Sequence, residues 1–170
     1  MSKVLKQRLY HLTLYNISEI QKGIQCYHAG IEYSLIHGNS AEYKQWANKD
    51  KTVIILNGGT TNSFGFEPYS NEEYFGTMQN HILELEKNGI KYSLFREPDL
   101  NNAITAIAFL VDERVWNKKD YPEISLFDLN IDIAENTIEK IKDKTREYYT
   151  KLYGKEVAFL REWLVNFRLA

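Results

Sequence analysis

The chain has little of what marks secreted, membrane-bound or low-complexity proteins. It contains one cysteine and three prolines among 170 residues, so no internal disulfide can form. No apolar N-terminal h-region and no run of 18 apolar residues occur, and we therefore expect a soluble, cytoplasmic protein without a membrane partner. The net charge is only −2, which excludes a strong global field that would attract a polyanion.

The hydrophobic residues, 44% of the chain, are sufficient for one sizeable core. Runs with strand and helix periodicity alternate, which predicts an α/β fold: a small, mixed four-stranded sheet flanked by helices, with a C-terminal helical extension. We expect one domain over residues 1–111, and a linker with a two-helix extension packed on it over 112–170. The strands are predicted at 9–15, 52–56, 90–95 and 104–111, and the continuous apolar run 52–56 favours a strand covered on both faces.

The segment 16–38 predicts a long helix with two distinct faces. Ser18 and Gln21 form a capping-box pattern, and Gly38 is a natural left-handed stop. At 100° per residue, an apolar stripe is expected to face the core; its members are Ile20, Ile24, Tyr27, Ile31 and Leu35. A quarter-turn away lies a polar row of Gln21, Gln25, His28 and Glu32. Gly23 and Gly30 each cost about 1 kcal/mol in a helix, so we expect a strand or a ligand to approach the backbone there.

Two connecting segments are candidates for a site. Residues 57–70 are irregular, and they are either a lid over a site or an insertion packed on the surface. A helix follows, with Ser70 and Glu73 as its capping box and an apolar stripe of Phe75, Met78, Ile82 and Leu85.

The connection 96–103 concentrates polar groups between two apolar strands, namely Arg96, Glu97, Asp99, Asn101 and Asn102. Pro98 restricts Glu97 to an extended conformation. The alternative is a solvated hairpin with an ion pair between Arg96 and Asp99.

The C-terminal third predicts two further helices after a mixed linker over 112–130. A charged amphipathic helix spans 132–153, Gly154 interrupts it, and a more apolar helix follows. So many large apolar groups in the last helix suggest that it docks on the main domain or on a second copy, which makes a homodimer through the terminal helices possible.

Several segments resemble the type II peptidyl-tRNA hydrolases over roughly residues 8–111. They are GIQCYHAG at 23–30, Trp46 followed by TVIIL, the helix before NGI, and SLFREPD followed by ITAIA. In that family, a helix bearing A-A-Q-x-x-H-A and a later D-A-G-x-T segment build one site. Gln25 and His28 match the helix motif, Thr105 matches the late threonine, and Glu97 stands at the aspartate. The family's lysine is replaced by Gln21, with Lys22 next to it.

The resemblance implies hydrolysis of the ester that joins a peptide to the terminal ribose of tRNA. Glu97 or Asp99 would position or deprotonate the water, and Arg96 or Lys22 would hold the terminal phosphate. Gln25 and His28 would orient their partners, although His28 can equally be a histidine at the edge of the core, and Thr105 can be structural. The expected ligand-binding set is Gln21, Lys22, Gln25, Arg96, Asn101, Asn102 and Thr105. No metal site and no cofactor are predicted, because the sequence has no ligand spacing or phosphate-cradling loop that would hold one.

Three functions remain open from the sequence. The first is an ester hydrolase acting at the 3′ end of tRNA or on a related nucleotide. The second is a non-catalytic protein that sequesters a free nucleotide or a nucleotide-derived signal in the same crevice. The replacement of the family lysine and the slightly acidic charge balance favour the second, because proteins that grip tRNA neutralise several phosphates. The third is a dimeric interaction module.

Overall fold

A computed structural model of the chain describes residues 4–60, 77–125, 127–129 and 137–170. The chain divides into two compact units, one formed by Met1–Val111 with Phe167–Ala170 and the other by Asp112–Asn166. Among the described residues, no helix combines the length and the apolar character needed to cross a membrane. The two units are taken in turn.

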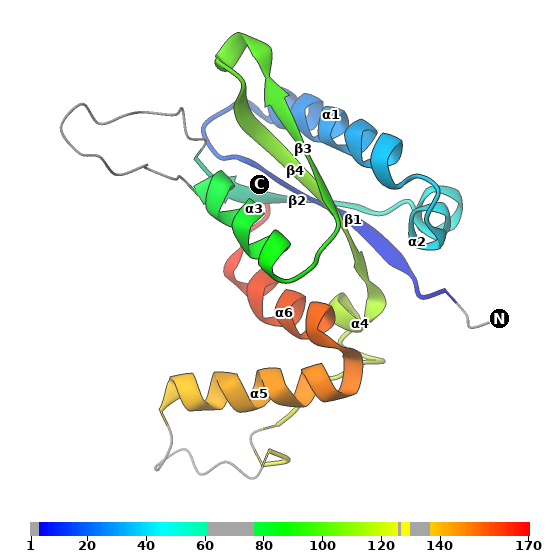
Figure 1. The fold of residues 1–170 in the computed structure, drawn as a ribbon, viewed down its shortest axis with the longest axis vertical. Helices are drawn as coiled ribbons and strands as arrows, with labels where there is room; N and C mark the ends of the chain where they lie inside the picture. Colours follow the sequence, from blue (N-terminus) through cyan, green and yellow to red (C-terminus); the bar gives the residue numbers. More distant parts are fainter. Residues whose placement is uncertain (1–3, 61–76, 126, 130–136) are drawn as a thin grey trace. The chain divides into compact units, whose positions relative to one another are not determined.

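The first unit is built on a mixed four-stranded sheet, as predicted (Figure 1). Its strands are β1 (Gln7–Leu14), β2 (Val53–Gly59), β3 (Tyr92–Glu97) and β4 (Ala103–Asp112), in the order β2-β1-β4-β3. β1 pairs with β2 in parallel, and β3 pairs with β4 in antiparallel fashion. Each of these two pairs has one register irregularity close to the end where β1 leads into the first helix.

Helices cover both faces of this sheet (Figure 1). α1 (Glu19–His37) packs across β3 and β1, and the predicted capping box of Ser18 and Gln21 is present at its start. The helix ends at Gly38 as predicted, but Gly38 has a right-handed backbone with φ −59°, so the left-handed stop is wrong. α3 (Thr77–Lys87) buries Met78, Ile82 and Leu85 as predicted; Phe75, the Ser70–Glu73 pair and the segment from 61 to 76 lie outside the described residues. Along the chain, α1 is followed before β2 by α2 (Ala41–Gln45), which Ser40 caps, and by a short π-helical turn (Trp46–Asp50).

The apolar stripe of α1 does not face the core, so that prediction is wrong. Its five members are exposed, by 43% at Ile31 to 77% at Ile20. The face against the sheet consists instead of Lys22, Gln25, Cys26, Ala29 and Tyr33. Cys26 and Ala29 are small, and they meet small groups on the strand side, Ala106 and Ala108. Small side chains on both surfaces let the helix lie close to the sheet, which a row of isoleucines would prevent.

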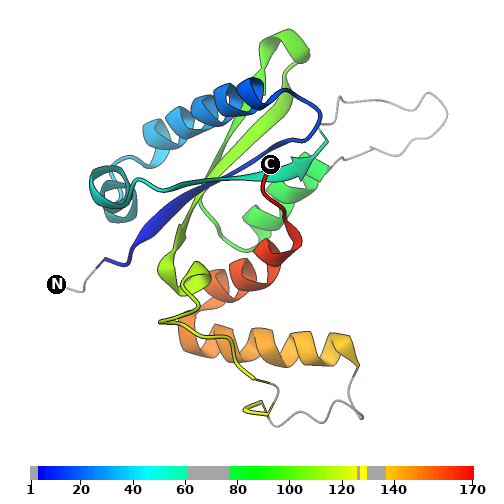
Figure 2. The same cartoon turned by 180° about the vertical axis from the view of Figure 1, so that it is seen from behind.

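β2 is an edge strand and is not covered on both faces, in contrast to the prediction for 52–56. Val53 is 46% exposed, and only two of the seven β2 residues are buried. The last residues of the chain run beside it: the Asn57 amide donates to the Arg168 carbonyl at 2.9 Å, and the Ala170 amide donates to the Ile55 carbonyl at 3.1 Å (Figure 2). This short pairing covers backbone groups that the sheet edge would otherwise expose.

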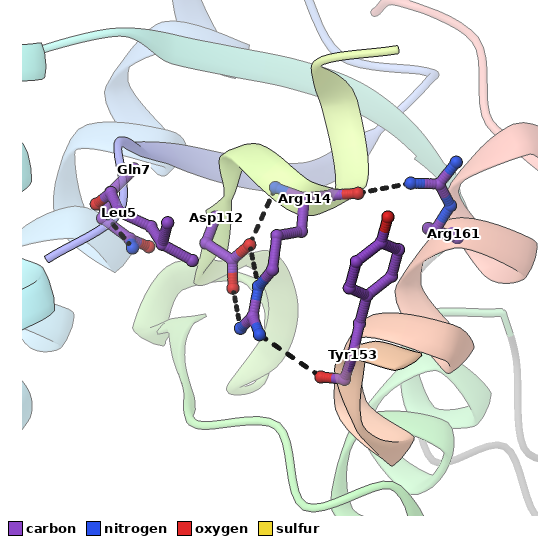
Figure 3. Close-up of polar contacts among 6 residues, drawn as sticks. All are labelled: Leu5, Gln7, Asp112, Arg114, Tyr153 and Arg161. Carbon is purple, nitrogen blue, oxygen red and sulfur yellow. Dashed lines mark hydrogen bonds and ion pairs between the residues drawn. The ribbon is translucent and has the colours of Figure 1, made fainter. Parts of the chain in front are cut away.

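The second unit is helical. The predicted linker contains a short helix, α4 (Glu113–Trp116), and the charged helix is α5 (Ile138–Tyr153); its predicted first residues, 132–136, lie outside the described ranges. α6 (Lys155–Trp163) packs against α5 and ends in a 3-10 turn (Leu164–Asn166). Arg161 is buried at the centre of this unit and donates to the Arg114 carbonyl, while Arg114 pairs with Asp112 (Figure 3). Docking of these helices on the first unit or on a second copy stays a prediction.

Candidate functional site

Gln25 is the residue around which the candidate site is assembled. It lies on the buried face of α1, and its side chain bridges two strands. Its amide nitrogen donates to Glu97 Oε2 at 2.7 Å, and its amide oxygen accepts from the Thr105 hydroxyl at 2.6 Å. The structure therefore brings Gln25, Glu97 and Thr105 together, although 72 and 80 positions separate the two partners from Gln25 in sequence.

A β-bulge turns Thr105 toward α1. Phe95 pairs with Ala106 and Arg96 pairs with Ile104, so Thr105 has no partner in the register. Side chains alternate between the faces of a strand, and Ala106 and Ala108 already point at α1. An unbroken strand would direct Thr105 to the opposite face; the extra residue of a bulge breaks this alternation and re-aims a side chain. The hydroxyl of Thr105 also reaches the Phe95 carbonyl at 3.5 Å.

Glu97 ends β3 and begins the turn that follows. Its backbone is extended, with φ −81° and ψ 113°, as Pro98 requires of the preceding residue. The side chain is partly exposed, and within the described ranges the contact with Gln25 is the one hydrogen bond to its carboxylate. One carboxylate oxygen is therefore fixed in place, and the other remains able to accept a proton or a hydrogen bond from a ligand.

The rest of the 96–103 connection shapes the turn. Asn101 and Asn102 have left-handed backbones, with φ of 53° and 57°, a conformation that asparagine tolerates better than most residues. Arg96 Nη1 donates to the Asn102 carbonyl at 3.1 Å. The connection is a hairpin with an exposed turn, as the alternative expected, but the ion pair between Arg96 and Asp99 that it included is not formed. Asp99, Asn101 and Asn102 are exposed on the turn.

The two neighbours Gln21 and Lys22 have different roles. Gln21 is exposed, and its amide oxygen accepts from the Ser18 backbone amide at 3.0 Å in the capping box. Lys22 lies three residues before Gln25 on the same buried face, with its side chain only 11% exposed, and pairs with Glu19 at 2.9 Å. The cation on the site side of α1 is therefore Lys22, one position later than the lysine of the family motif.

His28 lies at the rim of this arrangement. It is exposed, and its ring stacks on Phe95 with centroids 4.4 Å apart and an interplanar angle of 17°. Phe95 precedes Arg96 on β3, so the stacking ties α1 to the strand that carries Glu97. Within the described residues, His28 makes no hydrogen bond with Gln25 or Glu97, and its catalytic role stays a prediction.

Two buried groups beneath the site were not singled out from the sequence. Thr13 is fully buried, and its hydroxyl donates to the Thr105 carbonyl at 3.1 Å, which supports the bulge from β1. Burial raises the pKa of the neighbouring Cys26 thiol to about 12, against a smaller opposite effect of its hydrogen bond with Thr13, so the thiol is unreactive. A polar residue that alternates with leucines directly before a helix was the one sequence signal for Thr13.

Comparison with known proteins adds no assignment. No protein-family model matches the chain, and a search of curated proteins gives no match. In the described part of the chain, no three His, Cys, Asp or Glu side chains are grouped so that they could hold a metal ion. The chemistry available is that of one positioned carboxylate, an amide, a hydroxyl and a nearby lysine.

Proposed function

We propose that the protein is an ester hydrolase of the peptidyl-tRNA hydrolase type, acting at the 3′ end of tRNA or on a related nucleotide ester. The observation that supports this proposal is the contact between Gln25 and Glu97. The resemblance assigned both residues to one site, and their side chains, on different elements, hydrogen-bond at 2.7 Å. A partly exposed carboxylate that is held from one side is suited to orient a water molecule.

In this mechanism, Glu97 is the group that positions the water and accepts its proton. The water oxygen bonds to the ester carbonyl carbon, the bond from that carbon to the ribose oxygen breaks, and the proton passes to the departing ribose oxygen. Gln25 keeps the carboxylate in place, and Thr105 keeps Gln25 in place, because each hydrogen-bonds to the next. Both are positioning residues, and a carboxylate held in this way loses little freedom when the substrate binds.

Lys22 is the cation that supports the substrate in this proposal. It shares the buried face of α1 with Gln25, and its ammonium group would stabilise a phosphate or the oxyanion that develops on the ester carbonyl. Arg96, Asn101 and Asn102 stay predicted ligand contacts. Arg96 donates to the backbone of this turn, and both asparagines are exposed on the turn that follows Glu97.

Hydrolysis is tested with an N-blocked aminoacyl-tRNA as substrate and release of the blocked amino acid as readout. We expect turnover by the full chain and a loss of about a hundredfold or more in Glu97→Gln, because general acid–base groups contribute on that scale. Asp99→Asn is the matched control, since Asp99 is exposed two positions away and is not bound by Gln25. Absence of turnover in the wild type, or equal loss in both variants, overturns the proposed mechanism.

A second candidate, the non-catalytic nucleotide binder, is favoured by one observation. Lys22 is already paired with Glu19, so the site-side cation is partly neutralised before any ligand arrives. Such a site would hold a small anionic ligand without needing to stabilise a transition state. Purified protein would then release an intact nucleotide upon denaturation, detectable by mass spectrometry, and Lys22→Met would reduce the amount retained. Retention of a nucleotide without turnover of the ester substrate would support the non-catalytic nucleotide binder.

A further inference from the structure

The exposed face of α1 carries an apolar stripe that is left uncovered in the part of the chain that the structure describes. We call this set the α1 stripe; its members are Ile20, Ile24, Tyr27, Ile31 and Leu35. Their exposed fractions are 77%, 48%, 68%, 43% and 74%. Single exposed apolar residues are ordinary, but five on one face of one helix form a contiguous patch of the kind that marks interaction sites.

The spacing of the α1 stripe matches a helix–helix seam. The first four members follow one another at intervals of four, three and four residues, as the core positions of a coiled coil do. No charged residue interrupts the stripe along its length. Glu19 directly precedes the first residue of the stripe, and Glu32 lies on a neighbouring face of the helix.

Gly23 provides a second, independent observation. A glycine is unfavourable in a helix interior unless something approaches the backbone. At Gly30 that neighbour is His11, whose ring lies 3.4 Å from the position of an added Cβ. At Gly23, among the described residues and apart from its chain neighbours and the helix's own backbone, no atom lies within 4 Å of that position. The glycine borders the stripe, and the space above it is open to the backbone of a partner.

We propose that the α1 stripe is the interface with a second copy of this chain, the two α1 helices packing antiparallel across a two-fold axis near Tyr27. The stripe is close to palindromic about that point. Antiparallel pairing sets Ile20 of one copy opposite Leu35 of the other, and Ile24 opposite Ile31. A two-fold interface must be self-complementary in this way.

Helix dipoles and area agree with this pairing. In the antiparallel arrangement, the two helix dipoles oppose one another favourably. At roughly 200 Å² for a large side chain, the exposed fractions correspond to roughly 600 Å² of apolar surface on each copy. Gln21, Gly23 and His28 at the flanks bring this toward the ~800 Å² per partner of a stable interface.

The inference is independent of the proposed hydrolase activity, because Gln25 and Glu97 lie on the opposite, sheet-facing side of α1. It also differs from a dimer through the terminal helices, which the sequence left as one of two alternatives. Variants of α1 and of the last helix therefore test different interfaces.

Sedimentation equilibrium of the full chain over a dilution series measures the association. We expect a species of twice the chain mass of 20.0 kDa, and at least a tenfold weaker dimer in Ile24→Lys and in Gly23→Leu. Leu83→Lys on α3 is the matched control, because Leu83 is 45% exposed and Ile24 is 48% exposed; it should leave the dimer unchanged. Circular dichroism confirms that each variant is folded. A wild type that is monomeric throughout, a dimer that survives Ile24→Lys, or pairing with another protein only, overturns the proposal.

Thiol cross-linking tests the orientation. Tyr27→Cys lies near the proposed axis and should cross-link the two copies with a short bismaleimide, whereas Leu35→Cys lies far from its symmetry mate and should not. The native Cys26 is 3% exposed and does not compete. Cross-linking of Leu35→Cys but not of Tyr27→Cys would contradict the antiparallel geometry.

Discussion

The Thr105 hydroxyl donates to the Gln25 amide oxygen at 2.6 Å, which joins a bulged central strand to the helix that covers it. On its other side, the carbonyl of Thr105 accepts from Thr13 at 3.1 Å. Thr13 and Thr105 are buried, and Gln25 is 9% exposed. Buried polar groups of this kind hold a unique geometry only while each has its partner. The connected side chains therefore bear on both the fold and the proposed chemistry.

The first prediction concerns this network. Gln25→Leu should lower the free energy of unfolding by about 1–3 kcal/mol, because the Thr105 hydroxyl loses its acceptor and Glu97 loses its donor. Thr105→Val should destabilise by a similar amount. Because the two residues share one hydrogen bond, the double variant should be less destabilised than the sum of the single ones, by about 0.5 kcal/mol or more. Urea denaturation of the four proteins measures this coupling; strict additivity would contradict it.

The sequence was informative where one physical effect decides the outcome. The capping box at Ser18 and the buried row of α3 were predicted correctly, because hydrogen-bonding at a helix end and periodicity on a single covered face are local properties. The mixed sheet also followed from the order of apolar runs. For α1 the prediction from apolar periodicity was wrong, because the face with the large apolar side chains is exposed and another face of the helix is buried. Cys26 and Ala29 are buried because close approach to Ala106 outweighs the greater area of the isoleucines.

The candidate site was predicted in part for similar reasons. Gln25 and Glu97 came from the resemblance, and their contact depends on a tertiary arrangement that no local pattern specifies. Thr105 was ambiguous, because strand alternation would turn it away from α1 and the bulge that reverses this is set by the pairing with β3. Placing Lys22 on the side of the site requires knowing which face of α1 lies against the sheet, and the apolar stripe had predicted the wrong face.

A second prediction concerns Gly58 of β2, which lies close to β1 and to α3. A Cβ at Gly58 would stand 2.6 Å from Met78 Sδ and 3.0 Å from Leu12 Cβ, so Gly58→Ala should destabilise the protein by about 1–3 kcal/mol. Met78 is fully buried and cannot easily yield. Met78→Leu shortens the side chain and should relieve part of the cost of Gly58→Ala. Thermal unfolding measures both; an undisturbed melting temperature in Gly58→Ala would contradict the close packing of β2 on α3.

A third prediction concerns Arg161 in the second unit. Its guanidinium donates to the carbonyls of Tyr121 and Pro122 at 3.1 Å, stacks over Tyr149 at 4.3 Å, and is 5% exposed. Arg161→Met should destabilise by about 3 kcal/mol, because several carbonyls lose a charged donor. Arg146→Met is the control, since Arg146 pairs with Glu162 at the surface and such pairs contribute about 0–1 kcal/mol. Equal effects in chemical denaturation would show that Arg161 does not anchor this unit.

The last prediction is a loss of stability in acid that originates at His11. This residue is 3% exposed beneath α1, and neither ring nitrogen makes a hydrogen bond of normal geometry. Burial lowers the pKa of His11 from 6.5 to about 4, and the Cys26 backbone opposes the shift only in part. Between pH 6.5 and about 4, His11 is therefore protonated in the unfolded chain and neutral in the folded chain. The free energy of unfolding should fall as the pH drops through this window, by at most about 3 kcal/mol from this group.

His11→Leu removes the titrating group, and the stability of that variant should vary less with pH between 6.5 and 4 than that of the wild type. The same comparison in His28→Gln, where the exposed ring is replaced, should retain the wild-type slope. Denaturant midpoints at several pH values give the measurement. Because the His11 ring is only 3% exposed, protonation requires α1 to separate from β1, and hydrogen exchange of the α1 amides should accelerate in acid in the wild type and not in His11→Leu. Equal slopes in the wild type and His11→Leu would show that another group is responsible for the acid sensitivity.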